Sequence, residues 1–222
     1  MSAPLGILGG TFDPVHNAHL QLAREALAAL PLGSIRWLPS GMPGHRDSPH
    51  ASAEDRLAML RLALAADARY AIDDAELRSD VRTYTVHTLQ RLRSELGPQV
   101  PLVFLIGADH LIALDRWKDW KRLFELAHFG VARRPGYPLQ PLPGAVAEEY
   151  AHRRGEAADL ARHPAGRIVV FDMTPLDISS SAIRRAFAAG RVPREALPAP
   201  VLAYIEQHSL YRQPQKGPPS PA

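Results

Sequence analysis

The segment Leu5–His19 reads LGILGGTFDPVHNAH and joins a short apolar run to a glycine pair and two histidines. The apolar residues Leu5 to Leu8 predict a buried strand, and Gly9 and Gly10 follow it. Glycines at this point let the backbone turn sharply and approach a ligand closely. A helix that begins near His16 directs its first N–H groups back toward this turn, a geometry that binds phosphate. The segment therefore predicts a phosphate site at the end of the first strand.

His16 and His19 are three residues apart, so a helix places both on one face, toward the predicted anion site. Their imidazoles can donate hydrogen bonds to phosphate oxygens, and protonated rings would also offset charge that builds on a pentacoordinate phosphorus. Metal sites use the same spacing but need a third ligand and often a carboxylate, as in H-E-x-x-H, whereas Asn17 and Ala18 lie between these histidines. The G-x-G-x-x-G of dinucleotide-binding folds and the G-K-[ST] of the P-loop are both absent. The pattern favours phosphate chemistry.

Apolar runs alternate with helical patterns along the rest of the chain. Further buried strands are predicted at Ile35–Leu38, Leu102–Ile106, Phe129–Ala132 and Ile168–Phe171. Apolar residues at helical spacing predict helices that contain Leu20–Leu30, Leu57–Leu64, Leu89–Leu96 and Pro198–His208. Strand, helix and strand in turn imply parallel pairing with right-handed crossovers, so we expect an α/β fold with a three-layer, Rossmann-like parallel sheet. Such sheets bind ligands at the carboxyl ends of their strands.

The predicted elements form a single domain over residues 1–212. A chain of 222 residues, 46% of them hydrophobic, can bury one sizeable core. The segment 136–166 is rich in proline and then polar, which indicates an insertion packed on the edge of the sheet. Residues 213–222, QPQKGPPSPA, predict a disordered tail.

The composition excludes several classes of function. The chain has no cysteine, which rules out disulfides, thiolate metal sites and a cysteine nucleophile. The N-terminus lacks a signal-peptide pattern, and no apolar run reaches the roughly 20 residues that span a bilayer. We therefore expect a cytoplasmic protein with no membrane partner. The net charge of +3 and the scattered arginines favour a pocket for a small polyanion over a nucleic-acid surface.

A second polar segment, Asp177–Arg184, reads DISSSAIR and follows the last predicted strand of the sheet. Serines at a helix start can cap the helix and donate hydroxyls to phosphate. Arg184, one turn later, can bind a phosphate through two parallel hydrogen bonds. Taken alone, the segment would be better explained as a plain capped helix with an exposed arginine, which is a common arrangement.

The two segments resemble the paired signatures of the nucleotidyltransferase superfamily of adenylyl- and cytidylyltransferases. GGTFDPVHNAH at 9–19 resembles its G-x-F-D-P-x-H-x-G-H motif, with Ala18 in place of the usual glycine. ISSSAIR at 178–184 resembles its I-S-S-T-x-I-R motif, with Ser181 in place of threonine. The resemblance implies that the two motifs lie on opposite sides of a bound triphosphate.

Shorter segments narrow the resemblance to the nicotinate-nucleotide adenylyltransferases. They are PGHR at 43–46, which resembles P-P-H-[KR], TYT at 83–85, which resembles S-Y-T, IGAD at 106–109, and RRPG at 133–136. Trp117 and the closing Leu-Tyr-Arg at 210–212 fit as well, so the match runs from Leu5 to Arg212. Phosphopantetheine adenylyltransferases share the first motif but typically have shorter chains and lack this combination.

This resemblance implies transfer of AMP from ATP to nicotinate mononucleotide, which gives nicotinate adenine dinucleotide and pyrophosphate. It implies Mg²⁺ as the cofactor, held mainly by phosphates and water and not by a protein cluster. For catalysis we expect His16, His19 and Arg184. For ATP we expect Gly9, Gly10, Thr11, Phe12, His45, Arg46, Gly107, Asp109, Arg134, Ile178, Ser179 and Ser180. For the acceptor we expect Thr11, Thr85, Trp117 and Lys118, with the Trp117 ring offering a stacking face for the pyridine.

Three alternatives stay open at the level of sequence. The acceptor could be nicotinamide mononucleotide or another phosphate monoester. The chain could be a nucleotide-binding regulator without turnover, although His16, His19 and Arg184 argue against that. It could also be a metal-dependent hydrolase that binds zinc through its histidines. The oligomeric state is open, and a homo-oligomer is compatible with the sequence.

Overall fold

The computed structural model describes residues 3–41, 49–79, 82–136, 139 and 141–212. In this part of the chain six strands form one sheet in the order β3-β2-β1-β4-β5-β6, and all neighbouring pairs are parallel. The strands are β1 (Leu5–Gly10), β2 (Ser34–Pro39), β3 (Tyr70–Ile72), β4 (Leu102–Gly107), β5 (His128–Arg133) and β6 (Ile168–Asp172). The predicted Rossmann-like sheet is confirmed. Because the strand order reverses between β1 and β4, their carboxyl ends border the crevice in which such sheets bind ligands.

Helices cover both faces of the sheet. They are α1 (Asn17–Ala29), α2 (Ala53–Leu64), α3 (Thr85–Leu96), α4 (Ala108–Ile112), α5 (Leu123–Leu126), α6 (Gly144–Arg153), α7 (Asp159–Arg162), α8 (Ser180–Ala188) and α9 (Ala199–Gln207). Single 3₁₀ turns are η1 (Ala75–Arg78), η2 (Leu114–Arg116), η3 (Trp120–Arg122) and η4 (Arg194–Ala196). No helix of the described residues is long and apolar enough to cross a bilayer.

The middle strand β4 shows how the three layers arise. Val103 and Leu105 point into one core, which α1, α2, α8 and α9 complete. Leu102, Phe104 and Ile106 point into the other core, which α3, α4 and α5 complete. Successive side chains of a strand face opposite sides of the sheet, so an unbroken apolar run is required where both faces are buried.

Two details of the elements differ from the prediction. The edge strand β3 was not predicted, because Tyr70 and Ile72 are only half-buried and Ala71 is exposed, so no apolar run marks it. Gly9 and Gly10 were expected after the first strand, but they belong to β1 and pair with Leu38 and Pro39 of β2.

The described part of the segment 136–166 contains α6 and α7, and Arg154 pairs with Ile168 of the edge strand β6, which agrees with the predicted position at the edge of the sheet. That this segment is an insertion stays a prediction. The predicted tail, residues 213–222, lies outside the described residues. The last predicted helix is α9.

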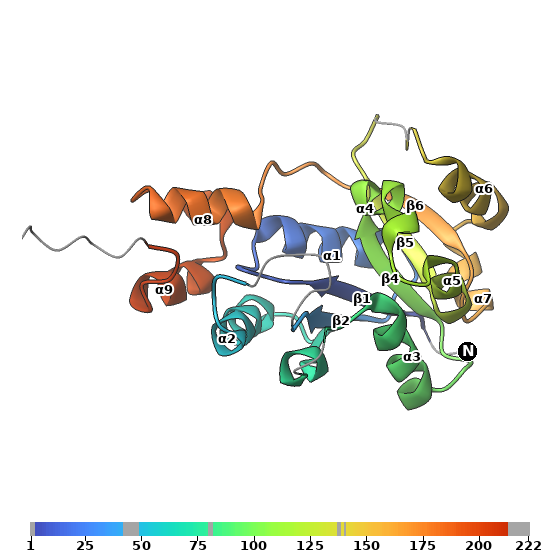
Figure 1. Cartoon of the computed structure of the whole chain (residues 1–222), viewed down its shortest axis with the longest axis horizontal. Coiled ribbons are helices and arrows are strands. Elements are labelled where there is room, and N and C mark those ends of the chain that lie inside the picture. Colours follow the sequence, from blue (N-terminus) through green and yellow to red (C-terminus); the bar gives the residue numbers. More distant parts are fainter. Residues whose placement is uncertain (1–2, 42–48, 80–81, 137–138, 140, 213–222) are drawn as a thin grey trace, which may run out of the picture.

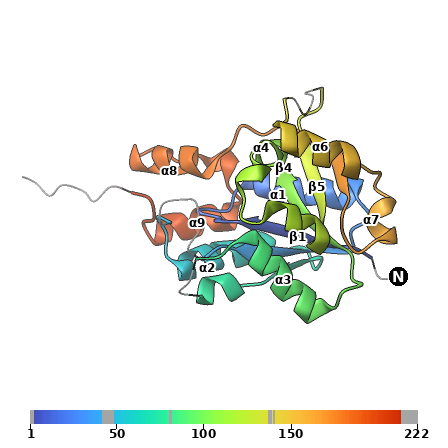
Figure 2. The same cartoon turned by 45° about the vertical axis from the view of Figure 1, so that its right-hand side comes forward.

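The two ends of the sheet carry different elements (Figures 1 and 2). The N-terminus and α7 lie at one end, and α8 and α9 lie beyond the other. Because the chain enters β1 from the N-terminal end, the carboxyl ends of the parallel strands face α8 and α9. Both predicted motifs therefore meet at this end.

Candidate functional site

The loop between β1 and α1, residues 11–16, is called the phosphate loop below and is shaped by the ring of Phe12. Phe12 adopts a left-handed backbone conformation, with φ of 50°, and its ring is buried against Trp37 and the edge of His19. A Cβ on Gly10 would lie 2.8 Å from this ring, so only glycine fits there. Because the Phe12 side chain is buried in the core, only the backbone of Phe12 is available for the predicted contact with ATP.

The carboxylate of Asp13 ties this loop to three distant segments. It is 4% exposed and accepts hydrogen bonds from the backbone N–H groups of His50 (2.8 Å) and Ala51 (3.1 Å). It also accepts one from the Tyr211 hydroxyl (2.8 Å), and an Arg184 Nη1 atom lies 3.7 Å away. Burial raises the pKa of the Tyr211 hydroxyl, and the negative charge of Asp13 raises it further. Tyr211 therefore stays a neutral donor.

His16 and His19 lie together at the start of α1, as predicted. Their rings are stacked, with centroids 3.7 Å apart. His16 is 5% exposed, and burial lowers its pKa to about 4, so the ring is neutral at pH 7. His16 therefore does not supply the positive charge that a protonated ring would bring to the phosphate. Its Nδ1 atom has no hydrogen-bond partner among the described residues. His19 Nδ1 accepts from the His16 backbone N–H (3.3 Å), so a neutral His19 carries its proton on Nε2.

The second motif docks directly on the first. An Arg184 Nη1 atom donates to the Asp13 carbonyl (2.7 Å), and Ser180 Oγ donates to the Pro14 carbonyl (3.0 Å). Ser179 is the N-cap of α8, and its Oγ accepts from the Ala182 N–H (3.2 Å), as predicted. The Arg184 side chain keeps 21% of its surface exposed. The structure thus brings the two motifs together, although some of their polar groups bond to each other. Ile178, beside them, is half-buried and packs against the core.

Two of the predicted acceptor residues, Trp117 and Lys118, contact aromatic rings. A Cβ on Gly9 would lie 3.5 Å from the Phe104 ring, and the edge of Phe104 meets Trp117, with centroids 6.1 Å apart. Lys118 Nζ lies 4.7 Å from the centroid of the Tyr84 ring, and Tyr84 is the N-cap residue before Thr85, the first residue of α3. Phe104, which the sequence marked only as a strand residue, therefore bridges the phosphate loop and Trp117.

The remaining predicted ATP residues are less enclosed. Asp109 is 82% exposed, its pKa is lowered mainly by a hydrogen bond from His110, and its carboxylate folds back over Gly107. Arg134 directly follows β5, is exposed, and pairs with no described residue. Thr11 contributes its carbonyl to a bond with buried Arg56. The predicted residues His45 and Arg46 lie outside the described residues.

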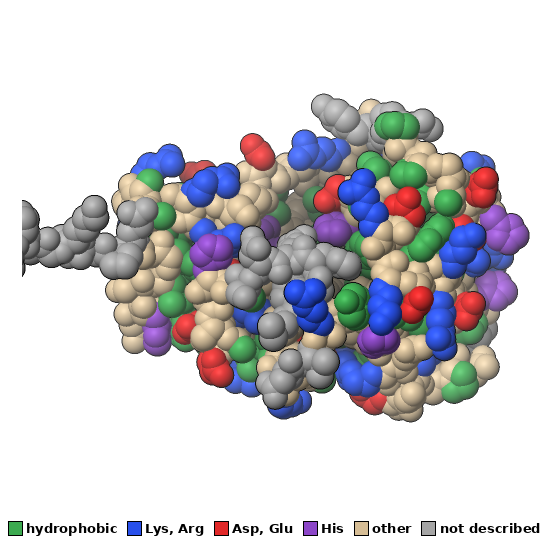
Figure 3. Space-filling view, in the orientation of Figure 1, with side chains coloured by type: hydrophobic (Ala, Val, Ile, Leu, Met, Phe, Trp, Pro, Cys, Tyr) green, Lys and Arg blue, Asp and Glu red, His purple; other side chains and the backbone are tan. Residues whose placement is uncertain are grey.

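The charged side chains on one face of the molecule do not form a continuous block. Figure 3 shows basic and acidic side chains interspersed over this face of the molecule. The described residues contain no group of three or more His, Asp or Glu side chains that could hold a metal ion. The expectations of no nucleic-acid partner and of Mg²⁺ bound through phosphates stay predictions.

Comparison with known proteins places this geometry in a family. The cytidylyltransferase-like family model matches residues 7–186. A probable nicotinate-nucleotide adenylyltransferase of Dechloromonas aromatica (strain RCB) is 49% identical over 96% of this chain and 99% of its own. Another, of Chromobacterium violaceum, is 46% identical over 96% of this chain and 100% of its own. The chain belongs to the nicotinate-nucleotide adenylyltransferase family.

Solved structures share the fold of this family member at low sequence identity. The Plasmodium falciparum nicotinic acid mononucleotide adenylyltransferase complexed with NaAD has a TM-score of 0.70 and 17% identity. The alignment covers 95% of this chain and 98% of that one. The same enzyme complexed with APC gives a TM-score of 0.68.

Three residues of this nicotinate-nucleotide adenylyltransferase family member were not predicted as site residues, namely Asp13, Arg56 and Tyr211. Their side chains hold the phosphate loop. Arg56 is 2% exposed, and its Nη1 donates to the carbonyls of Thr11 (2.8 Å) and Ser40 (2.7 Å). Burial lowers the pKa of its guanidinium. One signal was present in the sequence, because Arg56 lies three and four residues before the buried Met59 and Leu60, on the apolar face of α2.

Proposed function

We propose that this protein transfers AMP from ATP to nicotinate mononucleotide and releases pyrophosphate. The observation that carries the proposal is the docking of the two motifs, in which Ser180 and Pro14 meet although they are 166 residues apart. The contact lies at the carboxyl ends of the strands, where the strand order reverses. The names of the relatives support the same reaction.

The chemistry needs no general base. A phosphate oxygen of the acceptor, already anionic at neutral pH, attacks the α-phosphorus of ATP in line, and the bond to the bridging oxygen of the leaving pyrophosphate breaks. Catalysis then rests on positioning and on donors aimed at the charge that develops. We assign these donors to His19 Nε2–H, to the exposed part of Arg184 and to the first N–H groups of α1. The neutral imidazole of His16 supports the His19 ring by stacking against it.

The nucleotide enters as its magnesium complex in this proposal. Asp13 is the buried carboxylate of the phosphate loop, and its oxygens are already taken by His50, Ala51 and Tyr211. With no cluster of ligands among the described residues, the ion would be held by the phosphates and by water. It would neutralise phosphate charge there, while the donors named above orient the substrate.

The acceptor pocket is assigned to the amino end of α3 and the Trp117 ring. A helix of this length offers unpaired N–H groups and a positive dipole end at Thr85, which suit a carboxylate better than a carboxamide. We therefore propose nicotinate mononucleotide over nicotinamide mononucleotide as the preferred acceptor.

The decisive experiment measures pyrophosphate release with ATP, Mg²⁺ and each acceptor in turn. We expect release with nicotinate mononucleotide and a lower kcat/KM with nicotinamide mononucleotide. Absence of release with every acceptor would overturn the enzymatic function and leave a nucleotide-binding regulator. Elemental analysis of the purified protein tests the zinc-hydrolase alternative, which requires tightly bound zinc.

A further inference from the structure

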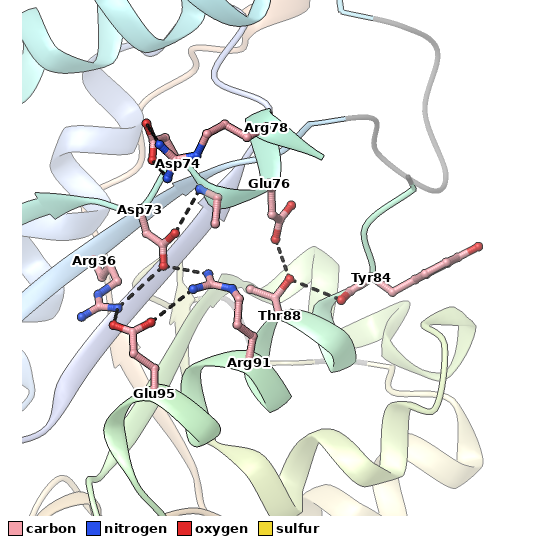
Figure 4. A network of polar contacts seen from close by, with 10 residues as sticks. Arg36, Asp73, Asp74, Glu76, Arg78, Tyr84, Thr88, Arg91 and Glu95 are labelled. Carbon is pink, nitrogen blue, oxygen red and sulfur yellow. Dashed lines mark hydrogen bonds and ion pairs between the residues drawn. The ribbon is translucent and has the colours of Figure 1, made fainter. Parts of the chain in front are cut away.

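Glu76 lies in η1, outside every motif, and yet it contacts both sides of the amino end of α3. One carboxylate oxygen accepts a hydrogen bond from the Thr88 hydroxyl (2.5 Å) and the other accepts one from the Thr83 hydroxyl (2.8 Å). Figure 4 shows Glu76 pointing at Thr88, one turn into the helix. Thr83 and Thr88 flank Thr85, where α3 begins. We call these three residues, Glu76, Thr83 and Thr88, the Glu76 clamp.

The Glu76 side of the clamp is fixed to the sheet. The Ala75 N–H donates to Asp73 (3.2 Å), and the Asp73 carboxylate pairs with Arg91 of α3 (2.7 Å) and with Arg36 of β2 (3.7 Å). On the other side the Glu76 carbonyl lies against Gly41, just beyond β2, where a Cβ would collide with it. η1 is thereby held between β2 and α3, and Glu76 transmits that position to the helix start.

The Thr88 side of the clamp is buried. Thr88 is 7% exposed, so its hydroxyl depends on protein partners. The carboxylate is its close partner, whereas the Tyr84 carbonyl lies 3.4 Å away. A carboxylate can accept from both threonines at once, and such charge-assisted bonds are stronger and shorter than neutral ones.

We propose that Glu76 is a positioning residue for the acceptor: the clamp fixes the amino end of α3, so that its first N–H groups stand ready for the acceptor's carboxylate. The inference rests on the proposed function, because it concerns the same acceptor pocket. Glu76 itself touches no reacting atom. Its loss should weaken acceptor binding more than ATP binding, since the phosphate loop is held by other residues.

The test compares three variants by steady-state kinetics. Glu76→Ala removes the clamp, Thr88→Val removes one of its bonds and keeps the side-chain shape, and Glu149→Ala is the matched control. Glu149 lies on α6 and pairs with Arg153 (2.6 Å), so the control also removes a paired glutamate but leaves the arginines that hold Asp73 untouched. For Glu76→Ala we expect the KM for nicotinate mononucleotide to rise about tenfold, with the KM for ATP within about twofold.

Thr88→Val should give an intermediate rise, and Glu149→Ala should leave both KM values within about twofold. Equal increases for both substrates, or the same increase in the control, would overturn the positioning role.

Hydrogen exchange provides a readout that does not depend on activity. The His87 and Thr88 N–H groups bond to the Tyr84 carbonyl in the first turn of α3. In the ligand-free protein we expect them to exchange faster in Glu76→Ala than in Glu149→Ala, and unchanged exchange would refute the clamp. If the wild-type protein releases no pyrophosphate, the proposed function fails, whereas this exchange measurement still decides whether the clamp orders α3.

Discussion

Two histidines that look equivalent in the sequence have different environments in the structure. Both lie on one face of α1, as the three-residue spacing predicts. The sequence could not show that His16 is 5% exposed and neutral whereas His19 stays half-buried, because burial depends on the whole fold and not on the spacing within one helix. Under the proposed function, contact with the phosphate therefore belongs chiefly to the Nε2–H group of His19.

The His19→Ala variant tests this division. We expect kcat for pyrophosphate release to fall by about 10²–10³, the loss typical of removing one preorganised donor. Thermal unfolding followed by circular dichroism should show a folded protein. His152→Ala, which changes an exposed histidine on α6, is the matched control and should keep full turnover. Near-normal turnover of His19→Ala would remove His19 from the proposed mechanism.

At the scale of elements, apolar runs predicted five of the six strands that the described chain contains, and helical spacing predicted α1, α2, α3 and α9. The short helices α4 and α5 were not predicted. These signals work because each element is buried along a continuous face. The short edge strand β3 lacks such a face.

The contacts that complete the site could not be predicted in the same way. The hydrogen bond of Asp13 with Ala51 spans 38 residues and that with Tyr211 spans 198. No local pattern encodes a partner at that distance. The motifs identified the loop, but only the fold shows what holds it.

The segment after α9 offers a test of that support. Tyr211→Phe removes one donor from the buried Asp13 carboxylate and keeps the ring against Phe187. We expect the free energy of unfolding, measured in urea, to fall by about 1–3 kcal/mol. Turnover should fall as well, because the loop loses one of its anchors.

Tyr204→Phe is the matched control on α9. Its hydroxyl donates to Asp55 of α2 (2.9 Å) and not to Asp13. We expect a smaller loss of stability and unchanged turnover. Equal effects of the two variants on turnover would contradict a specific role of Tyr211.

At the scale of the whole molecule, two buried histidines make stability depend on pH. Burial lowers the pKa of both His16 and His128 to about 4, from an ordinary value of 6.5. Between these values the unfolded chain binds more protons than the folded one, so stability is complete above pH 6.5 and is lost as the pH falls toward 4. Between pH 7.5 and 5.0 we expect each histidine to contribute a loss of about 2 kcal/mol to the free energy of unfolding.

Urea titrations at the two pH values measure this loss. His128 is fully buried, with its ring nitrogens bonded to the His163 carbonyl (2.7 Å) and the Arg167 N–H (3.0 Å). His128→Asn should reduce the pH-dependent loss by about half, whatever its stability at pH 7.5. The range stays above the ordinary pKa of carboxyl groups, so acidic residues contribute little. A variant that retains the full loss would show that His128 is not its source.

The tie between Asp13 and Tyr211 has a consequence for how the protein is made. Ribosomes add Asp13 198 residues before they add Tyr211. A growing chain therefore holds the complete motif long before it holds the Tyr211 hydroxyl that helps to fix the loop. A copy of the protein cut before Tyr211 would carry the signature of the family without this part of its working geometry.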